Sequence, residues 1–150
     1  MTVADASPAR PAPPAVALSV RLSYADCDPA GILYYAAWFI VMERVLSEWF
    51  LGRGFRFDTM TDQVGGAPVT RSTWCEYLAP ARVYDLVSVE MRVAEVGRSS
   101  YALSFEMTRS DDGVVVARSG ICCVFLDRSG VPAPLPAGFR AVLEDGRDGS

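Results

Sequence analysis

Apolar and polar residues alternate from residue 16 to residue 24, and this is the first regular pattern along the chain. Val16, Leu18 and Val20 fall on one side of an extended backbone, and their neighbours fall on the other. A period of two predicts a half-buried β-strand. The preceding residues 1–15 are rich in Ala and Pro, and that composition predicts a disordered tail.

The period changes to that of a helix between about Tyr35 and Leu51. At 3.6 residues per turn, apolar side chains cover most of its circumference. Its polar residues share one narrow stripe: Glu43, Arg44, Ser47 and Glu48. Gly52 and Gly54 follow, as glycines often do where helices end. Such a wide apolar surface predicts a helix buried on most sides, with the stripe left for water or a partner.

Alternation returns in the second half of the chain and predicts four more strands, over residues 68–78, 87–93, 101–107 and 114–126. Short turns at 96–98 and 111–113 join the last three. The final strand is apolar on both faces in its second half, which is typical of a strand inside a sheet. Residues 55–67 show little pattern and are expected to form a loop.

The element order is therefore one strand, one long helix and four strands. The simplest arrangement is of the α+β class, with one antiparallel sheet of five strands wrapped around the long helix. The folded domain is expected to span residues 16–143. After Asp127 several prolines precede a short helical or irregular end, and residues 144–150 are expected to form a disordered tail.

A chain of 150 residues, half of them apolar, suits one globular domain with a real core. Its net charge of −4 argues against nucleic acid as a partner. No apolar run has the length of a membrane span, and residues 1–15 lack the continuous apolar segment of a signal peptide. We therefore expect a cytoplasmic protein with no membrane and no nucleic acid as partner.

The residue types that the chain lacks exclude several chemistries. It has no His, which excludes Ser-His-Asp triads and Cys-His pairs. It has no Lys, which excludes Schiff-base chemistry. Its cysteines form no C-x-x-C pair, so we expect reduced thiols and no metal. Acid–base chemistry near neutral pH then depends on a carboxylate, with Tyr and Cys as the alternatives. The cysteines are Cys27, Cys75, Cys122 and Cys123.

The strongest chemical candidate is the run Tyr-Ala-Asp-Cys-Asp-Pro-Ala-Gly-Ile-Leu-Tyr-Tyr at residues 24–35. Asp26 and Asp28 stand two apart, a Pro and a Gly turn the backbone, and the apolar helix follows. The start of a helix presents unpaired N–H groups and the positive end of its dipole. An acid beside such donors suits hydrolysis of an acyl group, in which water is activated and an oxyanion is held. The alternative is structural, because Asp is a common N-cap and Pro is favoured at the first helical position.

The same run resembles the signature of the hotdog-fold thioesterases, in particular the 4-hydroxybenzoyl-CoA thioesterase branch and its acyl-CoA relatives. Leu-Ala-Pro-Ala-Arg-Val-Tyr-Asp at residues 78–85 is similar to that family's strand-bend segment. Glu-Val-Gly-Arg-Ser-Ser-Tyr at residues 95–101 is similar to its following hairpin. The three segments stand in the family's order within residues 16–127.

The resemblance implies a hotdog fold, which is a five-stranded antiparallel sheet around a central helix, and hydrolysis of acyl-CoA without a metal or organic cofactor. It also implies homo-oligomers, either dimers paired edge to edge or dimers of dimers (homotetramers), with the site at the subunit interface. Asp28 matches the catalytic carboxylate, and the backbone N–H of Tyr35 matches the oxyanion donor. The hairpin of Arg98, Ser99 and Ser100 lies where relatives touch the CoA phosphates or pantetheine.

Two departures from the family pattern concern the substrate. Ala36-Ala37-Trp38 stands where many relatives carry Pro-Asn-Tyr, and the hairpin has one Arg where some relatives have several basic residues. The thiol carrier is therefore either CoA or an acyl carrier protein. The Trp and Phe content near the helix makes an aromatic acyl group one candidate.

The residues around Asp28 receive mostly structural interpretations. Asp26 is expected to shape the loop by an Asx-turn. Cys27 is expected to fill space, since no base stands ready to activate it. Gly31 is expected either to take a positive φ or to let the backbone approach the substrate. The candidate second acids are Glu43, Glu48 and Glu76.

These observations predict an acyl-CoA thioesterase in which Asp28 acts as general base or as nucleophile toward the thioester carbonyl. A second hypothesis is a thioesterase that releases a product from an acyl carrier protein. Two hypotheses from other classes are an acyl-binding protein without catalysis and an obligate structural partner within a hetero-complex.

Overall fold

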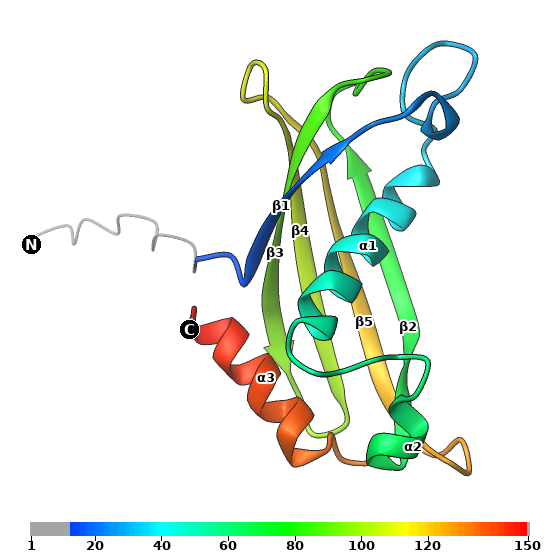
Figure 1. Cartoon of the computed structure of the whole chain (residues 1–150), viewed down its shortest axis with the longest axis vertical. Helices are drawn as coiled ribbons and strands as arrows, with labels where there is room; N and C mark the ends of the chain where they lie inside the picture. Colours follow the sequence, from blue (N-terminus) through cyan, green and yellow to red (C-terminus); the bar gives the residue numbers. More distant parts are fainter. Residues whose placement is uncertain (1–12, 150) are drawn as a thin grey trace, which may run out of the picture.

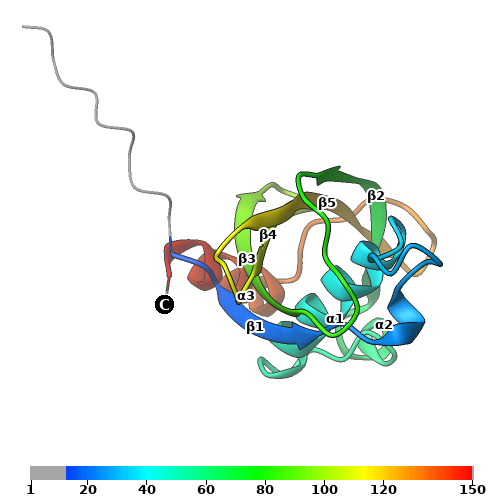
Figure 2. The same ribbon diagram turned by 90° about the horizontal axis from the view of Figure 1, so that it is seen from above.

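Residues 13–149 of the chain are described by the structure, a computed structural model. Five antiparallel strands form one sheet that curls around a long helix (Figures 1 and 2). The strands are β1 (Val16–Arg21), β2 (Gly66–Tyr77), β3 (Leu86–Val96), β4 (Ser100–Arg109) and β5 (Val115–Asp127). The helices are the 3₁₀ turn η1 (Tyr24–Asp26), α1 (Ala37–Leu51), α2 (Met60–Val64) and α3 (Ala137–Asp148). The strand order is β1-β3-β4-β5-β2, so β1 and β2 are the two edges.

The alternating sequence pattern becomes an inner and an outer face of the sheet. Along β3 and β4 every second side chain is buried, and the side chains between them are half-buried for most of each strand. The pairing register keeps the buried positions together, since Val89 pairs with Leu18 on one side and with Met107 on the other. This confirms the predicted α+β arrangement of one antiparallel sheet around one helix.

The long helix α1 lies against the inner face of the sheet and is buried along most of its surface. Trp49 and Phe50 are 2% and 0% exposed. The predicted polar stripe stays open, and Ile40 and Leu51 extend it with exposures of 57% and 56%. One side of α1 is therefore uncovered within the described chain.

Two expectations around α1 differ in detail. The helix begins at Ala37, because Tyr35 and Ala36 form a turn that precedes it. Residues 55–67, expected to be a structureless loop, contain the short helix α2 and the first residues of β2. Both differences shift element boundaries and leave the order of the major elements unchanged.

The C-terminal helix α3 is the largest departure from the sequence expectation, which placed a tail at residues 144–150. Phe139 and Leu143 are fully buried, and the Phe139 ring stacks on that of Phe50 with centroids 5.1 Å apart. Gly146 packs so closely on Trp49 that an added Cβ would lie 2.5 Å from the ring. The chain through Asp148 therefore belongs to the folded domain. Of the tail expected at residues 1–15, residues 1–12 lie outside the described residues.

The edge strand β2 is long and exposed. It has 12 residues, and it hydrogen-bonds to β5 on one side only. Val69, Trp74 and Tyr77 are 44%, 53% and 50% exposed. A long edge with exposed apolar side chains is a template for pairing with another chain.

Candidate active site

Asp28 lies in a loop whose backbone is fixed on both sides. Its N–H donates to the carbonyl of Ile32 at 2.9 Å, and its carbonyl accepts from the N–H of Gly31 at 2.9 Å. Its Oδ1 accepts from the N–H of Ala30 at 2.8 Å. Within residues 13–149 its Oδ2 makes no hydrogen bond. The loop therefore orients the carboxylate and leaves one oxygen available to water or substrate.

The N-cap alternative for Asp28 is wrong, because α1 begins well beyond it and Ala36 occupies the N-cap position. Tyr35 lies in the turn just before the helix. The N–H of Tyr34 donates to Asp26 at 3.0 Å and that of Ala37 donates to Tyr34 at 2.8 Å. Between them, the N–H of Tyr35 makes no hydrogen bond in the described part of the chain. An unpaired donor at the positive end of a helix dipole suits a developing oxyanion.

Asp28 and Tyr35 line one cleft of 390 Å³, which we call the Asp28 cleft. It lies between the residue 28–35 loop, the start of α1 and the end of β2. Its walls are mostly apolar, and apolar walls strengthen electrostatic interactions inside a site. The other lining residues are Ile32, Leu33, Trp38, Tyr77, Leu78, Ala79, Pro80 and Ala81.

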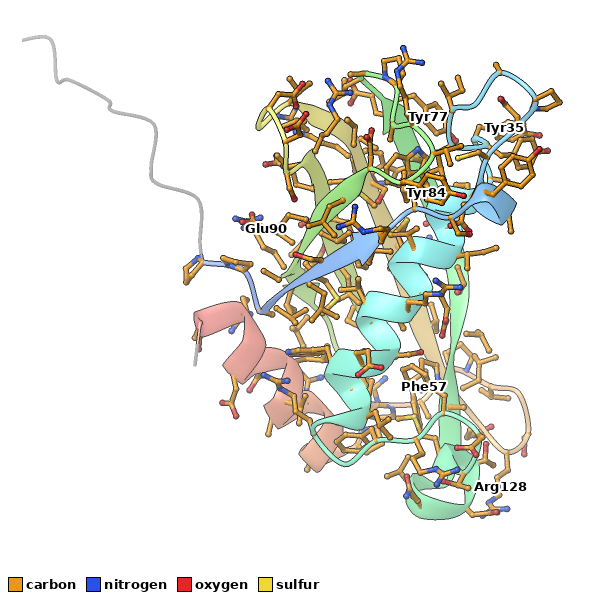
Figure 3. The ribbon with its side chains drawn as sticks, turned by 45° about the horizontal axis from the view of Figure 1, so that its top comes forward. Tyr35, Phe57, Tyr77, Tyr84, Glu90 and Arg128 are labelled. Atoms are coloured by element: carbon orange, nitrogen blue, oxygen red, sulfur yellow. The ribbon has the colours of Figure 1, made fainter. Side chains whose placement is uncertain are left out.

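Tyr77 is a member of this cleft that the sequence pattern did not identify. Its hydroxyl donates to the backbone carbonyl of Tyr35 at 3.1 Å, and Figure 3 shows both residues at the same end of the molecule. The Tyr35 ring lies against that of Tyr34, with centroids 4.5 Å apart. A tyrosine at the end of a strand carries no signal of its own, since only the folded chain brings it to the helix start.

The loop and the residue 78–85 segment are joined by backbone hydrogen bonds. The N–H of Leu33 donates to the carbonyl of Ala81 at 2.7 Å, and that of Val83 donates to Gly31 at 3.2 Å. Gly31 itself has φ +75°, and an added Cβ there would meet nothing within 4 Å. The positive φ that the sequence suggested is confirmed, and it is the backbone conformation that requires glycine here.

Asp26 and Cys27 serve the loop. The Oδ2 of Asp26 accepts from the N–H of Ser23 at 2.8 Å and from its hydroxyl at 3.0 Å. Asp26 thus shapes the loop as expected, although by a capping box and not by an Asx-turn. Burial raises the pKa of the Cys27 thiol, and the charges of Asp26 and Asp28 raise it further. A raised pKa suppresses the thiolate, which disfavours Cys27 as a nucleophile.

The β3–β4 hairpin, which contains Arg98, Ser99 and Ser100, lies at the end of the sheet opposite to the Asp28 cleft (Figure 1). Ser100 pairs with Val124, close to the Gly66 end of β2. At about 3.3 Å per residue, β2 separates this end from the Asp28 cleft by about 35 Å. One chain therefore does not bring the hairpin and Asp28 together.

Arg98 is held by its backbone and leaves its side chain available. Its carbonyl accepts from the N–H of Leu135 at 2.9 Å and from the Nη2 of Arg140 at 3.1 Å. Its exposed guanidinium makes no hydrogen bond or ion pair within residues 13–149. A fixed backbone with an unused cation suits contact with an anionic ligand.

The candidate second acids do not line the Asp28 cleft. Glu43 and Glu48 stand on the exposed stripe of α1, where the hydroxyl of Ser47 donates to the Glu43 carboxylate. Glu76 pairs in register with Arg118 on the outer face of the sheet. Asp28 is thus the one carboxylate of the cleft.

Across residues 13–149 no group of three or more Cys, Asp or Glu side chains is placed to hold a metal ion. In the same part of the chain, every helix is too short or too polar to cross a membrane.

Comparison with known proteins places this chain in a family. The sequence profile of the thioesterase-like superfamily matches residues 22–143. The acyl-CoA thioesterase YbgC of Haemophilus influenzae is 27% identical over 124 residues, which cover 83% of this chain and 90% of that protein.

Solved structures show the same fold. A 1,4-dihydroxy-2-naphthoyl-CoA thioesterase from Synechocystis superposes with a TM-score of 0.81 at 17% identity, covering 86% of this chain and 95% of that one. A mutant 4-hydroxybenzoyl-CoA thioesterase complexed with 4-hydroxybenzoyl-CoA superposes with a TM-score of 0.77 at 20% identity, covering 85% and 97%. These likenesses confirm the predicted hotdog fold. Since the family profile spans most of the chain, from the start of the loop to the last helix, this protein belongs to the thioesterase-like superfamily.

Proposed function

We propose that this protein hydrolyses acyl-CoA thioesters, with Asp28 as general base or nucleophile and the N–H of Tyr35 as oxyanion donor. The observation that carries the proposal is the shared cleft. One Asp28 oxygen accepts from Ala30 and the other makes no hydrogen bond within residues 13–149, while Tyr35, whose amide is unpaired in the same range, lines the same cleft. The acyl-CoA thioesterase YbgC, a relative over most of the chain, supports the substrate class.

The chemistry follows either of two balanced routes. As general base, Asp28 takes a proton from water while the oxygen adds to the thioester carbonyl. As nucleophile, the carboxylate adds to the carbonyl itself and forms an anhydride that water then hydrolyses. In both routes the N–H of Tyr35 stabilises the tetrahedral oxyanion, the C–S bond breaks, and the thiolate of CoA leaves and takes up a proton.

The test is thiol release from a panel of acyl-CoA thioesters by the wild type and Asp28→Asn. Loss of the carboxylate is expected to lower kcat about 100-fold or more. Asp111→Asn, in the exposed β4–β5 turn, is the matched control and should keep the wild-type rate. A folded Asp28→Asn protein with near-wild-type turnover would refute the catalytic role. An acyl-binding protein without catalysis would bind the panel and release no thiol even as wild type.

The active form is proposed to be a homodimer that pairs through β2. Antiparallel pairing of two β2 edges by a two-fold axis would extend the sheet and satisfy the free backbone groups. Because such pairing reverses the strand, the Gly66 end of one copy meets the Tyr77 end of the other. The hairpin of one chain would then approach the Asp28 cleft of its partner, although it lies far from the Asp28 cleft of its own chain. The proposal extends to dimers of dimers, in which two such homodimers associate.

Sedimentation analysis tests this interface. Val69→Lys and Trp74→Lys place charges on the exposed edge and should shift the protein to monomers with low activity. Val131→Lys alters an equally exposed apolar residue away from β2 and should leave the assembly intact. Assembly unaffected by both β2 changes would contradict the proposed edge.

CoA is the proposed thiol carrier, and an acyl carrier protein is the alternative, because the hairpin supplies only one cation. Thioesters with the same acyl group on the two carriers separate these functions by their kcat/KM values. The proposed location is the cytoplasm, because the four cysteines are free thiols, as is usual in a reducing compartment.

A further inference from the structure

Arg140, on the C-terminal helix α3, holds the backbone of the β3–β4 hairpin. Its Nη2 donates to the carbonyl of Gly97 at 2.7 Å and to that of Arg98 at 3.1 Å. Figure 1 shows the first turns of α3 beside this hairpin. The side chain of Arg140 is only 31% exposed, so these bonds are partly shielded from water. The last helix thus fixes a hairpin whose Gly97 lies 43 residues earlier in the chain.

The position of Arg140 is set by the packing of α3. The preceding residue, Phe139, is fully buried, and its ring centroid lies 5.1 Å from that of Phe50 and 5.5 Å from that of Tyr101. One turn later, the Glu144 carboxylate accepts from the Nη1 of Arg140 at 3.5 Å. The buried ring anchors the helix and the carboxylate orients the guanidinium, so Arg140 meets the hairpin in a defined geometry.

Two consecutive carbonyls of the hairpin point toward α3. Those of Gly97 and Arg98 accept from the same nitrogen of Arg140. The N–H of Leu135, just ahead of α3, also donates to the carbonyl of Arg98 at 2.9 Å. On the other side of the hairpin, the carbonyl of Ser99 accepts from the N–H of Phe125 at 2.8 Å. The peptide planes at the tip are therefore held by the C-terminal segment and by β5.

The same bonds turn two amides away from α3. In a trans peptide, the N–H points opposite to the carbonyl of the preceding residue, and the peptide bonds of residues 97–99 are trans. The N–H of Arg98 is therefore opposite to the carbonyl of Gly97, and the N–H of Ser99 is opposite to the carbonyl of Arg98. Neither N–H donates a hydrogen bond within the described chain. Successive unpaired amides on one side of a turn are suited to receive an anion.

The Arg98 side chain adds a cation to these two amides. It is exposed and makes no hydrogen bond or ion pair in the part of the chain that the structure describes. We call the N–H of Arg98, the N–H of Ser99 and the Arg98 guanidinium the hairpin donors. Donors that are fixed before binding avoid the entropic cost of being ordered by the ligand. Arg140 supplies that order for the two amides.

Resting on the proposed acyl-CoA thioesterase activity, we infer that Arg140 is a positioning residue that keeps the hairpin donors turned toward a phosphate group of CoA. It acts through the backbone of Gly97 and Arg98 and does not touch the thioester. Without Arg140, both carbonyls lose a charged partner and the peptide planes are free to rotate. A carbonyl oxygen turned outward would repel a phosphate. Loss of Arg140 should therefore weaken binding of CoA and leave the chemistry at Asp28 unchanged.

The experiment measures KM and kcat for one acyl group carried on CoA and on N-acetylcysteamine, which lacks the phosphates. Arg140→Met removes the guanidinium and keeps most of the apolar stem. It is expected to raise KM for the CoA thioester about fivefold, with kcat unchanged, because charge-assisted contacts of the hairpin are weakened. Both constants for the truncated thioester should stay at their wild-type values. Arg140→Lys keeps the charge without the planar fork and should recover part of the loss.

Arg53→Met is the matched control. Arg53 also donates from its guanidinium to a backbone carbonyl, that of Trp49 on α1 at 3.3 Å. Its loss should leave KM unchanged for both thioesters. A double variant with Arg98→Ala adds a second test. Because Arg140 and Arg98 serve the same contact, their effects on KM for the CoA thioester should multiply to less than the product of the single effects.

A purely structural role for Arg140 gives a different result. Arg140→Met would then lower Tm and either keep the wild-type KM for acyl-CoA or raise KM equally for both thioesters, and either outcome would overturn the inference. If Arg140→Met does not fold, Arg140→Lys decides by the same comparison. Failure of the proposed function is distinct, since the wild type itself would release thiol from neither thioester.

Discussion

The hydroxyl of Tyr77 donates a hydrogen bond of 3.1 Å to the backbone carbonyl of Tyr35. The last residue of the edge strand is thereby tied to the turn that leads into α1. Because the proposed oxyanion donor is the N–H of the same Tyr35, this bond restrains the orientation of the donor. Burial raises the pKa of the Tyr77 phenol, so the donor keeps its proton at neutral pH.

Tyr77→Phe is expected to lower kcat about tenfold with little change in KM, since loosening a positioned donor weakens binding of the transition state more than binding of the substrate. Steady-state kinetics of thiol release measure both parameters. Tyr35→Phe is the control and should behave like the wild type, because the proposed role uses the backbone of that residue. A large loss in Tyr35→Phe would mean that its hydroxyl acts directly.

Arg98→Ala is expected to raise KM for an acyl-CoA about tenfold and to leave KM for a short N-acetylcysteamine thioester unchanged. A surface Arg–phosphate contact accounts for a factor of that order. The comparison of the two thioesters isolates the nucleotide portion of CoA. Equal effects on both would place Arg98 outside the CoA contact.

Mixing subunits tests whether Arg98 serves the cleft of its partner. In a dimer of one Asp28→Asn chain and one Arg98→Ala chain, one site would contain both intact residues. With random exchange, the activity at low acyl-CoA should rise to about a quarter of the wild-type value, because half of the dimers carry one intact site of two. Absence of recovery would indicate that both residues serve the same chain's site.

Cys27 reports the charge of Asp28. Its raised pKa keeps the thiolate fraction low, so its alkylation by iodoacetamide at mildly alkaline pH should be slow. Asp28→Asn removes one of the charges that raise this pKa and should speed alkylation a few-fold, followed by mass spectrometry of the residue 27 peptide. Buried Cys123 should show no such change, and an unchanged Cys27 rate would place the Asp28 charge elsewhere.

The β4–β5 turn should make stability depend on acid pH. Hydrogen bonds from Arg109 lower the pKa of the Asp112 carboxyl below its ordinary value. Its contribution is therefore present above the unfolded pKa and is lost as pH falls through the lower folded pKa. Asp112→Asn should melt below the wild type at neutral pH, and the two Tm values should converge in acid. A constant Tm difference across this range would contradict the pairing.

The fold was predictable where one face of an element is apolar and the other polar. Alternation located β3, β4 and their hairpin, and the wide apolar surface of α1 indicated an enclosing sheet. The hydrophobic pattern did not predict the full length of α3. The prolines at 132, 134 and 136 and the acidic end of the chain obscure the short spacing of Phe139 and Leu143. The burial of that helix depends on Phe50 and Trp49, which lie far away in sequence.

The candidate site was predictable where its residues are consecutive. Asp28 and Tyr35 stand in one run with a recognisable order of acid, turn and helix. Tyr77 has no such order, because only the folded chain brings the end of β2 to the turn before α1. The candidate role of Arg98 came only from the family resemblance. Within one chain, Arg98 and Asp28 lie at opposite ends of the sheet.

The unpaired side of β2 has a consequence for how output depends on abundance. An enzyme that is active only as a homodimer obeys mass action, so the active dimer dissociates when it is diluted below its dissociation constant. Turnover per unit volume would then grow as the square of the amount of chain present. Such an enzyme would show little activity at trace expression, and its activity would rise steeply as expression increases.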